Sequence, residues 1–368
     1  MNRRRAAALA AVLLYPSTEL HKELRNTGVD AVWDRFVRRD VRLPDTVLTR
    51  FAALDVDALL RRTEQCGARI IVPGDDEWPV QLDDLGPATP WALWLRGEQL
   101  QQQRSVAIVG SRSCTMYGER VAADFAVGIA NAGLPIVSGG AFGIDAAAHR
   151  GALATSTPTV AVLASGVDVP YPVAHSALFD RIVAAGTLVS ESPPGARPMR
   201  QAFLIRNRII AALAYGTVVV EARYRSGALS TYRHASDLNR IVMGVPGPVS
   251  APESGGVHEL LKTGAQLVTS ADDVLVLVAP LGTVAGEVHA ESTGEWDELT
   301  SVQRQVYDAF PTRAPISVDA LLGALTADIG IGQLLASLTG LAQRGLVAEG
   351  LDGAWKRNRR LRGAETCR

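Results

Sequence analysis

The sequence contains few residues that bind metals or form covalent cross-links. Its three cysteines, Cys66, Cys114 and Cys367, lie too far apart for a disulfide framework or a metal-ligand motif. Its six histidines form no HExxH-type pair. These absences argue against a zinc enzyme and against a disulfide-stabilised secreted domain, and they are typical of a reducing cytoplasm. We therefore expect no metal site.

Net charge and long apolar runs are also lacking. The chain carries 37 basic and 38 acidic residues, which excludes a uniformly basic surface but not a local basic groove. Three arginines precede an apolar run at 6–14, as in a signal peptide, but the run has no cleavage site and is too short to span a bilayer. We interpret it as an amphipathic helix and expect a cytoplasmic protein without membrane attachment.

The 368 residues, 47% of them hydrophobic, suffice for two or three domains. Apolar spacings of three and four predict helices at 6–14, 29–38 and 47–65, so residues 1–66 are expected to form a small helical, SAM-like module. Residues 281–296, rich in Gly, Ala, Glu and Thr, predict a linker. Residues 297–368 show three short helical patterns and a hairpin around Asp352-Gly353, which indicates a winged-helix-like domain with a basic tail.

Residues 67–280 form the predicted core. Two strand patterns come first, at 68–72 and 91–95, and strand and helix patterns alternate from residue 104. Most of these strands are apolar throughout, which indicates a sheet covered on both faces. The expected fold class is α/β, with an extended Rossmann-like, doubly wound and mostly parallel sheet. The later strands are predicted at 106–109, 136–138, 159–163, 187–190, 217–220, 241–245 and 266–268.

The first glycine turn follows the strand at 106–109. Gly110 permits a tight turn, Ser111 can donate a hydroxyl, and Arg112 can bind a phosphate through two N–H groups. The turn lacks the later glycines of GxGxxG, and no acidic residue closes the second strand, so no dinucleotide cofactor is expected. The pattern favours an anion-binding crevice lined by backbone N–H groups. The alternative is that Arg112 caps local carbonyls.

The second turn contains Gly139, Gly140 and Gly143, which have no side chains and so leave the backbone N–H groups accessible to a ligand. Asp145 stands where a helix begins, as a helix cap or an early-turn acid does. His149 follows four residues later on the same helix face and could be a base with an acid partner. No nucleophile lies nearby, so we favour a structural role and expect no catalytic residue.

A third element places polar residues at the entry of an apolar helix. Arg206, Asn207 and Arg208 interrupt the pattern that begins at Phe203. Two arginines are costly in such a place unless an anion or a carboxylate meets them. They are therefore predicted to face the crevice, with pairing to Glu191 or Glu221 as the alternative. Phe203 is either a stacking surface for a base or a core residue.

The fourth element follows the strand at 217–220. Arg223, Arg225, Ser226 and Gly227 come after it, just before another helix. The carboxyl ends of the strands in open α/β sheets are where ligands bind, so the four elements are expected to meet there.

The order of these motifs resembles that of the DNA-processing protein A (DprA, or Smf) family over roughly residues 67–280. The matching segments are Ile108-Val-Gly-Ser-Arg112, Val137 to His149, Thr159 to Leu163, Val167-Asp168, Tyr171-Pro172, Ser190-Glu191, Arg206 to Ile210, Val219 to Ala222, Ser226 to Leu229, Val245 to Gly247 and Gly264-Ala265. The chain departs from the family at Phe142, Ser165, Leu204 and Tyr232.

The resemblance implies a core that binds single-stranded DNA, forms a homodimer and has no catalytic activity. Members protect incoming DNA during natural transformation and load the RecA recombinase onto it, with single-strand-binding protein as a further partner. Carried over by position, Ser111 and Arg112 would hold backbone phosphate, and Arg206 and Arg208 would line the same groove. Phe203 and Ser226 would lie near the bases, and no cofactor is implied.

Two other functions are compatible with parts of the pattern. A LOG-type phosphoribohydrolase, which acts on nucleoside monophosphates, uses a similar crevice with a glutamate after a Pro-Gly-Gly-x-Gly-Thr turn. Here Gly216-Thr217 precedes Glu221, but Pro-Gly-Gly is absent. A nucleotide-sensing winged-helix regulator is the other candidate, although its third helix is weakly charged and therefore poorly suited to groove readout.

Overall fold

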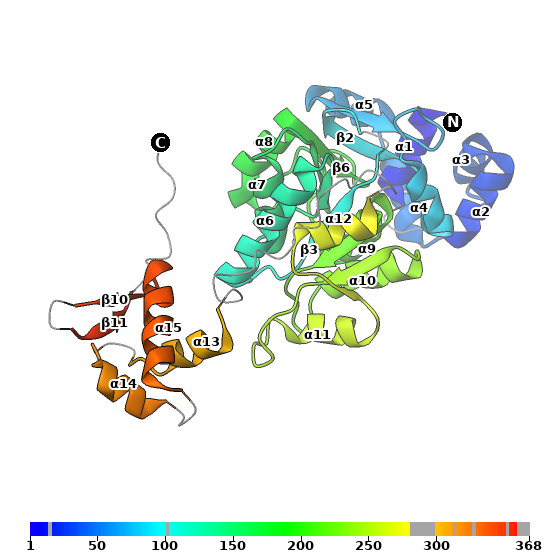
Figure 1. The fold of residues 1–368 in the computed structure, drawn as a ribbon. Coiled ribbons are helices and arrows are strands. Elements are labelled where there is room, and N and C mark those ends of the chain that lie inside the picture. The colour runs from blue at the N-terminus through cyan, green and yellow to red at the C-terminus, as the bar shows by residue number, and fades with distance from the viewer. Residues whose placement is uncertain are drawn as a thin grey trace. The chain divides into compact units, whose positions relative to one another are not determined.

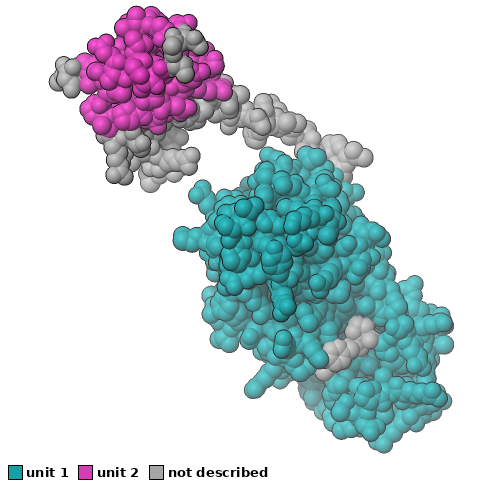
Figure 2. Space-filling view, turned by 90° about the horizontal axis from the view of Figure 1, so that it is seen from below, with its two compact units in different colours: residues 1–284 teal, residues 285–368 magenta. Residues whose placement is uncertain are grey.

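A computed structural model describes residues 1–13, 17–100, 103–279, 299–311, 314–325, 329–350 and 353–358. The chain divides into two compact units, residues 1–284 and residues 285–368, which Figure 2 colours separately. The finer boundaries at residues 66 and 280 stay predictions, and the linker at 281–296 lies outside the described residues. Among those residues, no helix has the length and apolarity needed to cross a membrane.

The first unit is built on one sheet of nine strands (Figure 1), which confirms the predicted α/β class. Strands β3 to β9 pair in parallel, and β1 and β2 form an antiparallel edge beside β6. In chain order the strands are β1 Ala68–Ile71, β2 Leu93–Gly97, β3 Val106–Val109, β4 Ile136–Ser138, β5 Thr159–Leu163, β6 Gly186–Ser190, β7 Gly216–Val219, β8 Ile241–Gly244 and β9 Gln266–Leu267.

The strand order is β1-β2-β6-β5-β4-β3-β7-β8-β9, which places a topological switch point between β3 and β7. From β3 the chain builds outward through β4 and β5 to β6, and then returns to the other side of β3 to add β7. Val106 of β3 therefore pairs with Ile136 on one side and with Gly216 on the other. Open α/β sheets bind ligands at such a point, outside the carboxyl ends of the strands.

Helices cover both faces of the sheet, as its apolar strands predict. Ile108 and Ile136 pack toward α6, α7 and α12, whereas Val109 and Val137 pack toward α9 and α10. The alternation follows from the two-residue period of a strand. The core helices are α6 Met116–Asn131, α7 Ile144–Ala152, α8 Ser176–Ala185, α9 Arg200–Leu213, α10 Ala228–Asp237, α11 Gly255–Lys262 and α12 Ala271–Val278, with 3-10 turns η1 Val80–Ala88 and η2 Val173–His175.

Five helices precede the sheet, where the sequence predicts three. Helix α2 was not predicted because it carries few apolar residues. The single helix predicted at 47–65 is two helices, α4 and α5, because Asp55 caps the start of α5 by accepting from the amide of Ala58. The five helices, blue in Figure 1, pack beside the β1–β2 edge. There Leu9 and Phe36 join a core cluster with Trp94. They are α1 Arg3–Val12, α2 Thr18–Thr27, α3 Val29–Arg38, α4 Asp45–Ala53 and α5 Val56–Gln65.

The second unit has the predicted three helices and hairpin. Its elements are α13 Ser301–Asp308, α14 Val318–Ala324, α15 Ile331–Gln343 and the antiparallel strands β10 Val347–Glu349 and β11 Trp355–Arg357. Val306, Leu321 and Leu334 are fully buried in a separate core. On the outer side of α15, Ile331 and Leu335 are exposed. Three arginines of the predicted basic tail, at 359, 360 and 362, lie outside the described residues.

Candidate nucleic-acid interface

A cleft of about 600 Å³ lies at the topological switch point, where β3 and β7 end. Elements that are far apart in the sequence form its walls: the loop after β3, helix α9, and the loop after β7 that leads into α10. Nine of the twelve residues predicted for the site line this cleft. They are Gly110, Ser111, Arg112, Phe203, Arg206, Asn207, Arg225, Ser226 and Gly227.

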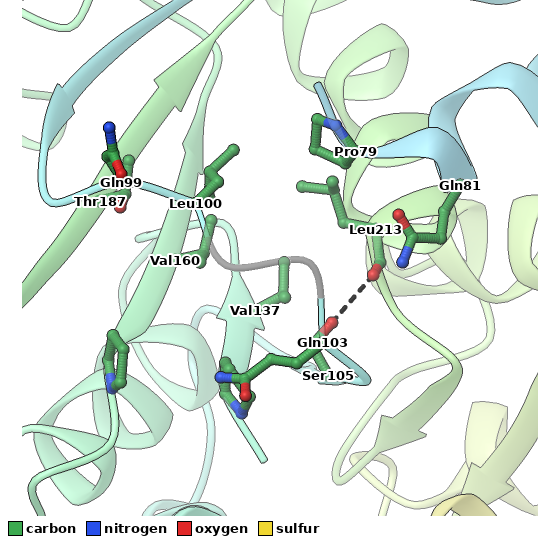
Figure 3. Close-up of a pocket in the computed structure, with 12 residues that line it drawn as sticks. Pro79, Gln81, Gln99, Leu100, Gln103, Ser105, Val137, Val160, Thr187 and Leu213 are labelled. Carbon is green, nitrogen blue, oxygen red and sulfur yellow. Dashed lines mark hydrogen bonds between the residues drawn. The ribbon is translucent and has the colours of Figure 1, made fainter. Parts of the chain in front are cut away.

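A much smaller pocket, of about 40 Å³, lies at the opposite, amino ends of the strands (Figure 3). Pro79, Leu100 and Leu213 supply part of its wall, and the hydroxyl of Ser105 donates to the carbonyl of Leu213 at 2.8 Å. None of the residues drawn there carries a charge. This pocket therefore lacks the cations that a phosphate would need.

The turn after β3 brings two loops into contact instead of presenting bare amides. The Ser111 amide donates to the carbonyl of Glu221 at 2.7 Å, and the Ser111 carbonyl accepts from the Ile144 amide at 3.2 Å. A Cβ on Gly110 would lie 2.5 Å from the Ile144 side chain, so Gly110 allows close packing between helix and strand. The Ser111 amide is thus already bonded, contrary to the sequence expectation. This leaves side chains as the better-supported anion ligands of this turn.

Arg112 is the exposed cation of this loop. Its guanidinium carbon lies 4.8 Å from the centre of the Phe203 ring, within cation–π range. Arg112 forms no hydrogen bond or ion pair with another described residue, so the alternative of carbonyl capping lacks support. The stacked guanidinium keeps its N–H donors available for a phosphate, and the ring beside it offers a flat apolar surface.

Helix α9 adds an arginine that the sequence reasoning missed. The helix begins at Arg200, three residues before the predicted start at Phe203, and Arg200 lines the cleft. Positions 200, 203 or 204, and 207 recur on one face of a helix. That spacing, extended backward from Phe203, is the signal that could have identified Arg200. The Asn207 amide group donates to the Gly227 carbonyl at 3.3 Å and so joins α9 to the loop before α10.

Arg206 lies at the floor of the cleft with only 6% of its surface exposed. Its guanidinium donates to the carbonyl of Gly139 at 2.7 Å and also to the carbonyl of Val162. A Cβ on Gly139 would lie 2.3 Å from this guanidinium, which explains why a glycine stands there. Burial lowers the pKa of Arg206 to about 10, so the side chain remains a cation at neutral pH.

Arg208 does not reach the cleft. Two of its nitrogens donate to the carboxylate of Glu191 at 2.8 and 2.7 Å, and a third donates to the carbonyl of Ala88 at 2.9 Å. Only 4% of the residue is exposed. The pairing with Glu191, which the sequence left open as the alternative, is therefore present. Arg208 joins α9 to β6 and η1, because a buried guanidinium needs internal acceptors for its donors.

The second glycine turn supports the cleft from below. The buried carboxylate of Asp145 accepts from the Ala141 amide at 3.3 Å, and its burial raises the pKa of this group. His149 lies 2.9 Å from the Thr159 hydroxyl, and burial lowers its pKa to about 3. His149 is therefore uncharged at neutral pH and serves a structural role. Gly140, whose φ is +71°, packs against the Phe179 ring and does not line the cleft.

The fourth element completes the rim at the start of α10. Ser226 accepts from the Ala228 amide at 3.3 Å through its hydroxyl. Arg223 pairs with Glu253 at 2.5 Å, whereas Arg225 forms no ion pair with a described residue. Arg200 likewise has no ion-pair partner among them. With Arg112, the cleft thus carries three exposed guanidinium groups that form no ion pair with a described acid.

Glu221 holds the start of α6. Its carboxylate accepts from the Thr115 amide at 2.9 Å and from the Thr115 hydroxyl at 2.6 Å, and only 4% of the residue is exposed. Thr115 in turn caps α6 through the Gly118 amide. Glu221 therefore has the contacts of a structural acid.

A Rossmann-like sheet with an arginine-lined cleft at its switch point defines a protein suited to a phosphate-bearing ligand. Residues 69–279 match the family described as DNA recombination-mediator protein A, and the chain belongs to that family. This match confirms the resemblance drawn from the motifs.

Related proteins extend the match beyond the core. The chain is 45% identical to a putative DNA processing protein DprA of Mycobacterium tuberculosis, over 83% of this chain and 80% of the relative. It is 39% identical to the DNA processing protein DprA of Streptococcus pneumoniae, over 64% of this chain and 82% of the relative.

Two solved structures share the fold. The X-ray structure of DprA from Streptococcus pneumoniae matches with a TM-score of 0.66 and 32% identity, over 76% of this chain and 98% of that one. DprA from Helicobacter pylori matches with a TM-score of 0.52 and 27% identity, over 57% of this chain and 94% of that one. The second structure is described for its unique mode of binding single-stranded DNA.

Proposed function

We propose that this protein binds single-stranded DNA in the cleft at the switch point. The observation that carries the proposal is the set of three exposed arginines, Arg112, Arg200 and Arg225, around a cleft that also contains Phe203. Guanidinium groups bind successive phosphates, and an aromatic ring accepts a base of any sequence. Proteins that hold single strands without sequence readout combine these two features.

In this proposal each predicted residue has one of four roles. Arg112 and Arg225 bind backbone phosphate together with Arg200, and Phe203 stacks a base. Gly110, Ser111, Asn207, Ser226 and Gly227 shape the cleft wall. Arg206, Arg208, Gly139 and Gly140 support the cleft from within the fold and do not contact DNA.

Family membership and the related proteins support a wider role in DNA processing. We propose that the protein acts in the cytoplasm as a homodimer, protects incoming single strands during natural transformation and loads RecA recombinase onto them. Single-strand-binding protein is then the competitor that it must displace. A RecA-loading assay on DNA coated with single-strand-binding protein tests this part by itself, and unchanged nucleation would contradict it.

The hydrolase alternative has less support. A LOG-type mechanism would assign the chemistry to Glu221, but that carboxylate is buried and already accepts two bonds from Thr115. The regulator alternative also has less support, because α15 carries no charged residue and exposes the apolar Ile331 and Leu335. We therefore propose a binding protein without catalytic activity.

The direct test is a salt titration of binding to labelled single-stranded and duplex DNA of equal length. We expect preference for the single strand and a linear fall of log affinity with log salt. Arg112→Ala should lower the slope by about 0.7, which corresponds to one phosphate contact on a single strand. Equal affinity for both forms of DNA, or wild-type binding by Arg112→Ala, would contradict the proposal.

A further inference from the structure

A second open cavity of about 600 Å³ adjoins the same two loops that form the cleft. Thr115, Tyr117, Glu221 and residues of the segment 246–254 line it. It shares no lining residue with the cleft, but the loop after β3 contributes to both, with Ser111 and Arg112 on one side and Thr115 on the other. The hydrogen bond between the Ser111 amide and the Glu221 carbonyl joins the two loops at this boundary.

The chemistry of this cavity differs from that of the cleft. No arginine or lysine is among its lining residues, and Pro246, Pro248 and Ala251 make much of the wall apolar. Its acidic group is Glu221, which is buried and bonded to Thr115. A phosphate there would lie near a carboxylate with no cation to compensate, so an uncharged planar group fits better than an anion.

Tyr117 is the side chain best placed to receive such a group. Its hydroxyl donates to the Pro246 carbonyl at 3.1 Å, so the ring is fixed across from the 246–254 segment, yet the residue remains 49% exposed. An aromatic ring held by a hydrogen bond can stack on a ligand with little loss of rotamer entropy. Two apolar residues next to the lining residues in sequence are also exposed: Met116, which precedes Tyr117, at 88%, and Val249, within the 246–254 segment, at 93%.

We propose that this cavity receives a nucleobase of the strand whose phosphates lie in the cleft, stacked on Tyr117. This inference rests on the proposed function, because the cleft must first hold the strand. Arg225, on the loop after β7, lines the cleft and has no ion-pair partner among the described residues. A strand whose phosphate contacts Arg225 can therefore place its next base in the cavity on the other side of that loop. The footprint on DNA is then longer than the cleft alone provides.

The test measures affinity for oligothymidylates of increasing length, from about 4 to about 20 nucleotides. Tyr117→Ala should bind the shortest strands like the wild type and should bind strands that reach the cavity about tenfold more weakly, as the loss of one base stack does. Tyr117→Phe retains the ring and should stay within about twofold of the wild type. The same weakening at every length would indicate damage to the cleft and would overturn the inference, as would no weakening at any length.

Abasic oligonucleotides identify the contacted group. Long strands with abasic sites at the 5′ end or at the 3′ end are measured with the wild type and with Tyr117→Ala. One of the two abasic oligonucleotides should bind the wild type and Tyr117→Ala with equal affinity, because it lacks the base that stacks on the Tyr117 ring. A difference that persists with both oligonucleotides would contradict a nucleobase ligand. Failure of the proposed function would give a different result. The wild type would then show no preference for single-stranded DNA over duplex DNA, and Arg112→Ala would bind with the affinity of the wild type.

Discussion

The exposed arginines of the cleft and the buried arginines of α9 differ in burial and in bonding partners, although the residue type is the same. Arg200 and Arg206 belong to one helix and lie six residues apart, yet Arg200 is exposed without an ion-pair partner among the described residues, and Arg206 is 6% exposed with two carbonyl acceptors. Arg208 has a carboxylate partner as well. Burial and partners, more than residue type, therefore separate an arginine that can bind a ligand from one that holds the fold.

This comparison makes opposite predictions for the two sets. Removing a buried arginine leaves its partners unsatisfied in a low-dielectric interior, so stability should fall. Removing an exposed one leaves the protein folded and should weaken DNA binding, because only the ligand loses a partner.

The largest expected effect is on stability, in Arg208→Ala. The substitution leaves the Glu191 carboxylate without its bidentate partner and should lower the free energy of unfolding by about 3 kcal/mol. Chemical denaturation measures this loss. Arg233→Ala on α10, where the side chain is exposed and forms no ion pair with a described residue, is the matched control. Adding Glu191→Gln to Arg208→Ala should restore part of the stability, and no recovery would argue against the pair.

The buried layer should also make stability depend on pH. His149 has an ordinary pKa of 6.5 that burial lowers to about 3, so between these values the unfolded chain binds a proton that the folded chain does not. Stability therefore falls as the pH falls, by about 1.6 kcal/mol from pH 6.5 to pH 5 for this group.

Denaturation at several pH values in the wild type and in His149→Gln isolates this contribution. The difference between the two proteins should change with pH over that range. The raised pKa of Asp145 acts in the opposite direction and is common to both proteins. A pH-independent difference would contradict the assignment of a neutral, buried His149.

On the exposed side, Arg200→Ala should weaken binding of single-stranded DNA about tenfold, or about 1.4 kcal/mol, and leave the unfolding free energy unchanged within about 0.5 kcal/mol. Arg197→Ala is the matched control, because Arg197 is exposed on the same segment but does not line the cleft. Fluorescence anisotropy and denaturation give the two quantities. Equal weakening in both variants would point to a general field of positive charge instead of a specific contact.

The smallest expected effect concerns an exposed arginine that acts through another loop. Arg62 of α5 bonds the Asp168 carboxylate at 3.0 Å, and that carboxylate accepts from the Gly195 amide at 2.7 Å. Residue 195 belongs to the segment that leads into α9 and Arg200. Because the Arg62 side chain is 55% exposed, its pair contributes little stability, and Arg62→Ala should weaken DNA binding only about two- to threefold.

Arg61→Ala removes the same charge from the same helix without affecting Asp168, because the ion pair of Arg61 is with Asp55, at 3.8 Å. DNA affinity should therefore be unchanged in that variant. If Arg61→Ala weakened binding as much as Arg62→Ala, the positioning role of Arg62 would be wrong.

The sequence predicted the fold more fully than the site. Apolar strands that end in glycine turns and alternate with helices are typical of a parallel sheet. The strands of the core were therefore predicted close to their observed bounds. The helical module was less well predicted, because α2 has few apolar residues.

At the site, Arg112 and Arg225 were predicted because each lies in the loop that follows a strand. Arg208 was assigned to the groove because periodicity does not reveal a partner that lies far away in the sequence, which here is Glu191. The Ser111 amide was expected to be bare for the same reason, since its acceptor is the Glu221 carbonyl. Arg200 was missed because the predicted helix began three residues too late.

The comparison between exposed and buried arginines is tested most directly by one paired measurement on Arg112→Ala and Arg206→Ala. Each variant is assayed for its unfolding free energy and, under conditions where it is folded, for its affinity for single-stranded DNA. The account predicts that Arg112→Ala loses about tenfold or more in affinity at wild-type stability, and that Arg206→Ala loses at least about 2 kcal/mol of stability. An Arg112→Ala variant that binds DNA normally, or an Arg206→Ala variant as stable as the wild type, would contradict it.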